Sequence, residues 1–165
     1  MLNRDRNDVE RVIREAFAGV TLGKKGVGLW WGQVLDDYEV PESVADYRAN
    51  REQTEERLDW NRIPVADLNR CYSSLSFFDA DGMRFHLPAF LIAELRGEFD
   101  HDLLFTLYYI NDYSKKQFSA LNTQQRMAVR AFLLFAQSYT LEDGTPWYEF
   151  DLPDIEKALA EYWVE

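Results

Sequence analysis

One stretch near the C-terminus, residues 124–138, constrains the fold more than any other part of the sequence. Its apolar side chains would surround nearly the whole circumference of a helix; they are Met127, Val129, Ala131, Phe132, Leu133, Leu134 and Phe135. Thr123 is a favourable residue for capping the start of such a helix. A helix that is apolar on all sides must be covered on all sides, so the sequence predicts a central, buried helix here.

Two further helices show a single apolar face, and they give the central helix something to pack against. Residues 8–20 carry apolar side chains at the spacing i, i+3, i+4 and i+7. Residues 153–163 begin with a proline, which is favoured in the first turn, and also present one apolar face. The predicted core centres on Phe17, Phe132 and Phe135, with Val12, Ile13 and Leu159 around them.

The middle of the chain is predicted to be helical as well, with one exception. Helical patterns cover about 29–38, a polar segment at 42–58, short stretches from Pro64 and from Pro88, and the apolar run 102–110. Residues 75–78 and 83–86 are apolar runs on either side of an Asp-Ala-Asp-Gly sequence, which is typical of a β-hairpin. The sequence therefore predicts a mainly α fold, a single compact helical domain over residues 1–165, with a small β-hairpin around residues 75–86.

Composition and charge exclude several classes of protein. No apolar run approaches the roughly 18 residues that a membrane span needs, and the N-terminus has no apolar signal-peptide core. A single cysteine excludes an internal disulfide and a cysteine-cage zinc site. These features predict a cytoplasmic protein. The 29 acidic and 18 basic residues give a net charge of −11, which argues against binding nucleic acid.

The motifs of cofactor and metal chemistry are not matched. The segment Gly23-Lys-Lys-Gly-Val-Gly28 lacks the P-loop order of glycine, lysine and Ser/Thr, so we interpret it as a flexible linker. Asp79-Ala-Asp-Gly82 resembles the start of a calcium loop, but its glycine falls at position 4 and position 12 is Phe90. The two histidines do not form an H-E-x-x-H motif. No cofactor and no metal are therefore predicted.

An enzyme remains an alternative, with its site around the predicted hairpin. Alternation along a strand would turn His86 away from its apolar neighbours and toward the surface. There it would act as a general base beside Asp79, Asp81 and Arg84, which are candidate acid/base and anion-binding groups. A structural subunit that hides its aromatic surface in a homodimer is a further alternative.

The C-terminal residues 140–165 combine acidic and aromatic side chains. Their acids are Glu142, Asp143, Glu149, Asp151, Asp154, Glu156, Glu161 and Glu165, against one base, Lys157. Aromatic side chains supply buried contact area at interfaces and carboxylates attract basic partners. We therefore predict a partner-binding surface formed by Trp147, Tyr148, Glu149, Asp151, Asp154 and Trp163. The competing interpretation is an acidic, solvated face over aromatic residues of the core.

These features favour a non-enzymatic acidic binding protein that occludes a basic protein partner, such as a toxin. Three blocks also resemble a family of bacterial proteins of unknown function: A-F-x-G-V-x-L-G at 16–23, W-x-x-I-P at 60–64 and L-S-F-x-D-x-x-G-x-R-F-x-L-P-A at 75–89. The resemblance covers roughly the N-terminal half and implies bacterial origin and a single domain, without catalytic residues. Small, acidic, aromatic-rich bacterial proteins include immunity proteins, which is an analogy of type alone.

Overall fold

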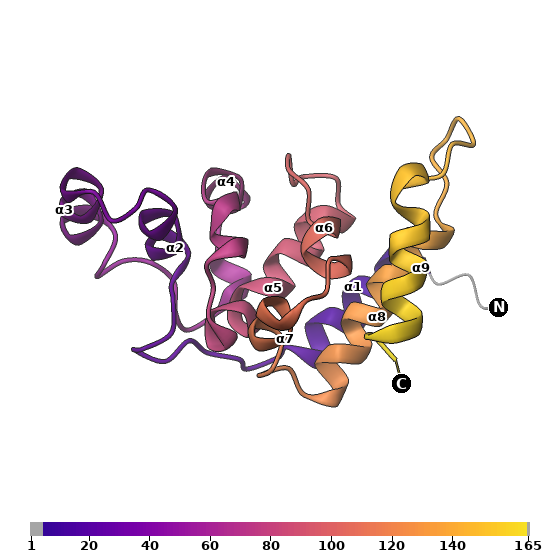
Figure 1. Cartoon of the computed structure of the whole chain (residues 1–165), viewed down its shortest axis with the longest axis horizontal. Coiled ribbons are helices and arrows are strands. Elements are labelled where there is room, and N and C mark those ends of the chain that lie inside the picture. Colours follow the sequence, from indigo (N-terminus) through magenta and orange to yellow (C-terminus); the bar gives the residue numbers. More distant parts are fainter. Residues whose placement is uncertain (1–4, 165) are drawn as a thin grey trace.

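A computed structural model describes residues 5–164, which fold into helices joined by loops and short 3₁₀ turns. The helices are α1 (Arg6–Ala16), α2 (Leu29–Asp36), α3 (Pro41–Asn50), α4 (Val65–Arg70), α5 (Ala80–Leu95), α6 (Leu104–Tyr108), α7 (Asp112–Gln117), α8 (Thr123–Ser138) and α9 (Leu152–Glu161); the 3₁₀ turns are η1 (Trp60–Arg62), η2 (Tyr72–Ser76) and η3 (Glu149–Asp151). Helices α2 and α3 form one end of the elongated molecule and α9 the other (Figure 1). The mainly α prediction is confirmed.

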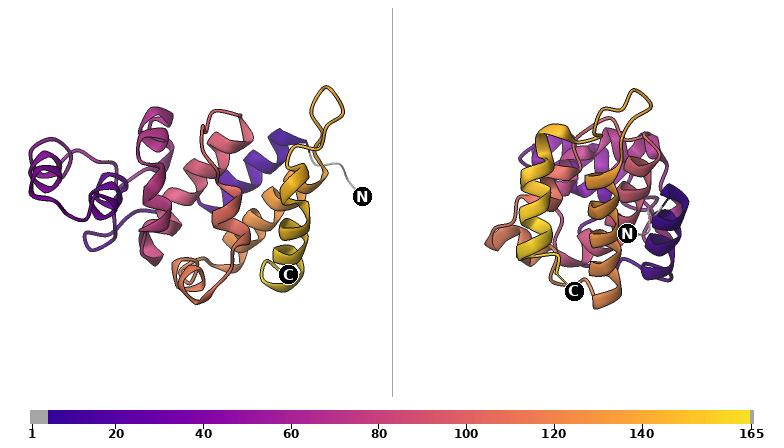
Figure 2. Two further views of the ribbon diagram at one scale, coloured as in Figure 1. Left: turned by 45° about the horizontal axis from the view of Figure 1, so that its top comes forward. Right: turned by 90° about the vertical axis from the view of Figure 1, so that its right-hand side faces the viewer.

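The predicted central helix is α8, and it packs against α1 and α9. Figure 2 shows these three helices gathered at the same end of the molecule. Asn122 caps its start: the Asn122 side chain accepts from the backbone N–H of Gln125 at 2.9 Å, and the Gln125 side chain accepts in return from the Asn122 N–H at 3.0 Å. Phe17, Phe132 and Phe135 are buried, so the predicted centre of the core is confirmed.

The predicted β-hairpin at 75–86 is wrong, and no strand forms anywhere in residues 5–164. The chain makes the turn η2 and then enters α5 directly. Asp79 is the N-cap of α5, because its Oδ1 accepts from the backbone N–H of Gly82 at 2.8 Å. The same oxygen also accepts from the Val27 N–H at 3.1 Å. Asp79, which was predicted to lie in a hairpin turn, therefore caps the start of a helix.

Helix α5 is almost completely buried, which explains why its sequence shows no one-sided helical pattern and was predicted as a hairpin. It packs against α1, α4, α7 and η1, so its apolar side chains point in all directions and leave no polar stripe. Pro88 was expected to start a helix and lies instead inside α5. Since proline has no N–H, the helix lacks the hydrogen bond that residue 88 would donate to residue 84.

The end formed by α2 and α3 is organised around a buried carboxylate, Glu55, whose side chain is 1% exposed. Its oxygens accept from the Tyr47 hydroxyl at 2.6 Å, from the Trp30 backbone N–H at 3.1 Å and from Arg57 at 3.3 Å. Helix α3 ends at Asn50, well before the predicted end at 58, because the chain turns there to bring Glu55 inside. Within the described residues, no helix has both the length and the apolar character required to cross a membrane.

Candidate functional site

Trp163, predicted to bind a partner, belongs to the core. Its side chain is fully buried, its indole N–H donates to the carbonyl of Leu107 at 2.8 Å, and its ring packs edge-on against Phe118 at 4.9 Å. Arg130, on α8, donates to the Trp163 carbonyl at 2.6 Å and to the Leu159 carbonyl at 3.1 Å, which satisfies carbonyls at the C-terminal end of α9. Trp163 therefore joins α6, α8 and α9.

Trp147 and Tyr148 are half-buried and also contribute mainly to packing. The Trp147 ring meets Phe135 edge-on at 5.9 Å, and the Tyr148 hydroxyl donates to the carboxyl of Glu94. Glu94 is itself buried, and this burial raises its pKa to about 7. These contacts attach the segment before η3 to the core.

Among the acids of the predicted partner-binding surface, Glu149 and Asp154 are exposed and Asp151 is half-buried. Asp151 accepts a hydrogen bond at 3.1 Å from the hydroxyl of Tyr108, on α6. The pKa of Tyr108 is raised to about 12, mainly by burial and to a smaller extent by this hydrogen bond to a carboxylate. The acidic segment is therefore connected to α6, which contains none of the predicted partner-binding residues.

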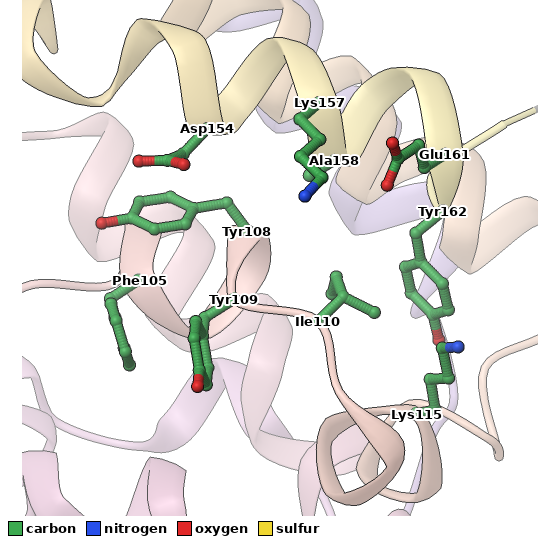
Figure 3. A pocket seen from close by; sticks show the side chains of 10 residues that line it. All are labelled: Phe105, Tyr108, Tyr109, Ile110, Lys115, Asp154, Lys157, Ala158, Glu161 and Tyr162. Carbon is green, nitrogen blue, oxygen red and sulfur yellow. The ribbon is translucent and has the colours of Figure 1, made fainter.

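Helices α6 and α9 pack against each other, and a hollow of about 560 Å³ lies along their junction; we call it the α6–α9 groove. Its lining is aromatic and charged: Phe105, Tyr108, Tyr109, Ile110, Lys115, Asp154, Lys157, Ala158, Glu161 and Tyr162. In Figure 3, Asp154, Lys157 and Glu161 project from α9 along one side. The aromatic side chains of α6 and of the residue after it stand opposite, and Lys115 reaches in from α7.

Two of the aromatic side chains that line the groove are exposed. Phe105 is 49% exposed and Tyr109 is 55% exposed, and their rings stack at 4.9 Å with 12° between their planes. Phe150, next in the chain to Asp151, is 93% exposed. Phe105 and Tyr109 are not among the predicted partner-binding residues, although the aromatic residues in the run 102–110 are visible in the sequence. That run has no clear apolar stripe, so nothing in it distinguishes inward from outward positions.

The charges of the groove itself balance, since it is lined by two carboxylates and two lysines. Further acids lie beside the groove: Asp102 and Glu149 are exposed and Asp151 is half-buried, with Asp102 bonded to the Phe105 N–H and Asp151 to the Tyr108 hydroxyl. Exposed apolar rings surrounded by carboxylates can accept aliphatic and basic side chains together.

The four residues of the alternative enzyme site do not form the cluster that was predicted across a hairpin. Asp79 is occupied in capping α5, and Asp81 is exposed in the first turn of that helix. Arg84 is half-buried, and its Nε has no hydrogen-bond partner within the described residues. No pair among these residues forms a hydrogen bond or ion pair in residues 5–164 that would link an acid to a base.

His86, expected at the surface, is fully buried. Its Nδ1 donates to the carbonyl of Gly82 at 2.7 Å, and its ring stacks on Phe78 at 4.4 Å. Nε2 faces no hydrogen-bond partner among the described residues. Burial lowers the pKa of His86 to about 4, so the ring is neutral at pH 7. A side chain enclosed in this way is out of reach of a substrate in solution. Over residues 5–164, no three His, Cys, Asp or Glu side chains gather as a metal site would require.

A family model described as "Family of unknown function (DUF6714)" matches residues 5–165, which is nearly the whole chain. The chain belongs to this family. The match of this DUF6714 chain extends well beyond the N-terminal half that carried the resemblance in the sequence. No curated protein and no solved structure matches the chain.

Proposed function

We propose that this DUF6714 chain is a non-enzymatic acidic binding protein that docks a basic protein partner over the α6–α9 groove and the acidic surface around it. Docking would occlude the basic site of the partner, as an immunity or antitoxin-type inhibitor does. The single observation that carries the proposal is the exposure of Phe105 and Tyr109 in a groove that also contains Asp154 and Glu161 of α9, with Phe150 exposed between the acids of η3.

Single exposed apolar residues are common on protein surfaces, but a group of them beside a groove is typical of an interaction site. Phe105 and Tyr109 would supply rigid, flat contact area beside the groove. Glu149, Asp151 and Asp154 would attract lysine or arginine side chains and increase the rate of association. Trp163 and Trp147 have a different role here from the one the sequence suggested, since Trp163 is part of the core and Trp147 packs against it.

The charge part of the proposal is tested by reversing exposed acids. The variant Glu149→Lys/Asp154→Lys/Glu161→Lys changes exposed acids in and beside the groove and leaves the Tyr108–Asp151 hydrogen bond in place. Partners are captured by crosslinking in cells that express the chain, and association is then measured with the purified partner. We expect slower association, with a defect that shrinks at high salt because exposed charges are screened over about 8–10 Å near physiological ionic strength.

The matched control places the same charge change at the far end of the molecule. Glu39, Glu42 and Asp46 are all exposed on α3 or just before it. The variant Glu39→Lys/Glu42→Lys/Asp46→Lys should therefore associate faster than the groove variant. Equal association by the two variants would refute the docking site.

The aromatic part is tested with Tyr109→Ala and Phe150→Ala, both at exposed positions. An anchor at an interface typically costs about 2 kcal/mol or more when truncated, mostly through faster dissociation. Unchanged dissociation rates in both variants would contradict the proposal. A second copy of the chain is the competing occupant, and a dimer that sedimentation detects and that Phe150→Ala dissociates would favour it.

A further inference from the structure

A second hollow, at the opposite end of the molecule from α9, has a different chemistry. It measures about 640 Å³ and lies between the Gly23–Gly28 segment and α3, and we call it the basic pocket. Four of its lining residues are cationic and only one, Glu52, is acidic; the complete lining is Lys24, Lys25, Gly26, Val27, Trp31, Tyr47, Arg48, Glu52, Gln53 and Arg57. A protein of net charge −11 thus contains a concave surface of clearly positive charge.

The glycine-rich wall of this pocket is held in place, contrary to the flexible linker that the sequence suggested. Arg57 donates to the carbonyl of Gly23 at 2.8 Å and to the carbonyl of Gly26 at 3.1 Å. The Val27 N–H donates to Asp79 at 3.1 Å, at the start of α5. Three hydrogen bonds over five residues fix the loop before any ligand arrives, which lowers the entropy cost of binding.

Three of the four cations that line the pocket form no ion pair within the described residues. Arg57 contacts Glu55, but no ion pair within residues 5–164 involves Lys24, Lys25 or Arg48. The sequence contains no acid between Glu15 and Asp36. The acidic surface around α9 lies at the other end of the molecule, and exposed charges are screened over about 8–10 Å, so the local positive charge dominates in the pocket.

Aromatic rings form another part of the pocket. Trp31 is half-buried, and its ring lies 5.0 Å from that of Tyr47, with 55° between the planes. The Tyr47 hydroxyl is anchored by its hydrogen bond to the buried Glu55 at 2.6 Å, so this ring is fixed. The pocket therefore offers an indole surface for a flat ring next to lysine and arginine side chains for an anion.

We propose that the basic pocket binds a nucleoside phosphate, with the phosphates on Lys24, Lys25 and Arg48 and the base against Trp31. The volume lies within the range of about 300–1,000 Å³ that is typical of small-molecule sites. A nucleic-acid strand is disfavoured, since its backbone would continue out of the pocket onto an acidic protein. The site holds phosphate through side-chain charge and differs in this from a P-loop.

The test compares two probes, ATP and inorganic tripolyphosphate, which share the triphosphate group and differ in the nucleoside. Binding to the full chain is measured by isothermal titration calorimetry, and the indole N–H signals are followed by NMR. We expect ATP to bind roughly tenfold more tightly than tripolyphosphate and to shift the Trp31 signal, because base–aromatic stacking is worth about 1–3 kcal/mol, equivalent to about five- to 150-fold. Equal affinities, or no ATP binding at millimolar concentration, would overturn the proposal.

Charge reversal at one exposed lysine provides the matched comparison. Lys25→Glu should weaken ATP binding roughly tenfold or more, since it replaces a phosphate contact with a repulsive charge. Lys116→Glu makes the same change on α7, outside the lining of the pocket, and should leave the affinity within about twofold. Both positions are exposed, so both variants should fold. Equal loss in the two variants would show that binding depends only on net charge and would overturn the site.

Discussion

Replacing Trp163 distinguishes a core residue from an interface residue. Truncation of a fully buried Trp to Ala typically costs about 3–5 kcal/mol of unfolding free energy. The Leu107 carbonyl would also lose its indole donor, and an unpaired buried acceptor costs about 1–3 kcal/mol. We expect Trp163→Ala to lose about 4–8 kcal/mol, which approaches the total stability of many domains. Trp163→Phe keeps a ring and should lose about 1–3 kcal/mol, mainly through the missing hydrogen bond.

The assay is urea denaturation at equilibrium, followed by far-ultraviolet circular dichroism. Phe150→Ala is the matched control, because it removes another C-terminal aromatic ring that is 93% exposed and should change stability by at most about 0.5 kcal/mol. A loss below about 1 kcal/mol for Trp163→Ala would refute the reasoning that this ring joins α6, α8 and α9. A similar loss for Phe150→Ala would refute it equally.

Three further experiments test contacts elsewhere in the molecule. Burial raises the pKa of Glu94 from 4.5 to about 7, so the folded state binds a proton more tightly than the unfolded state. The free energy of unfolding should therefore fall as the pH rises from about 4.5 to about 7. Glu94→Gln should flatten this dependence in denaturation curves recorded across that range. Asp79→Ala should cost about 1–2 kcal/mol through loss of the α5 cap, and Asp81→Ala, at an exposed position in the same helical turn, clearly less in the same melts. Gly32→Ala should cost about 1–3 kcal/mol by overpacking, since its added Cβ would lie 2.6 Å from the Ser74 side chain, whereas Gly23→Ala meets nothing within 4 Å and should be close to neutral in thermal unfolding.

The helices with a regular apolar pattern were readable from the sequence. The prediction over 8–20 corresponds to α1 (Arg6–Ala16), that over 124–138 to α8 (Thr123–Ser138), and that over 153–163 to α9 (Leu152–Glu161). Their spacing is a local property, because every third or fourth side chain lies on the same face of a helix whatever surrounds it. For the same reason the core around Phe17 and Phe132 was predictable.

The helical structure of α5 could not be predicted from its apolar pattern, because the rest of the protein covers this helix on all sides. A helix covered on all sides needs apolar residues at every position, and such a run also contains the alternation of a strand. Asp79 favours both a turn and a helix N-cap. In the folded chain Asp79 accepts a hydrogen bond from Val27, which lies 52 residues earlier. A pattern of neighbouring residues in the sequence carries no information about such a distant contact.

The candidate site shows the division between sequence and tertiary structure most clearly. The sequence by itself determined that acids and aromatic residues are concentrated near the C-terminus, that the fold is mainly helical, and that the lysines at 24 and 25 stand in a stretch without acids. Only the tertiary structure decided that Trp163 points inward while Phe150 points outward, and that α6 joins α9 to form a groove. The physical reason is that burial of a ring depends on which distant segments cover it, and residue type sets only how much free energy that burial contributes.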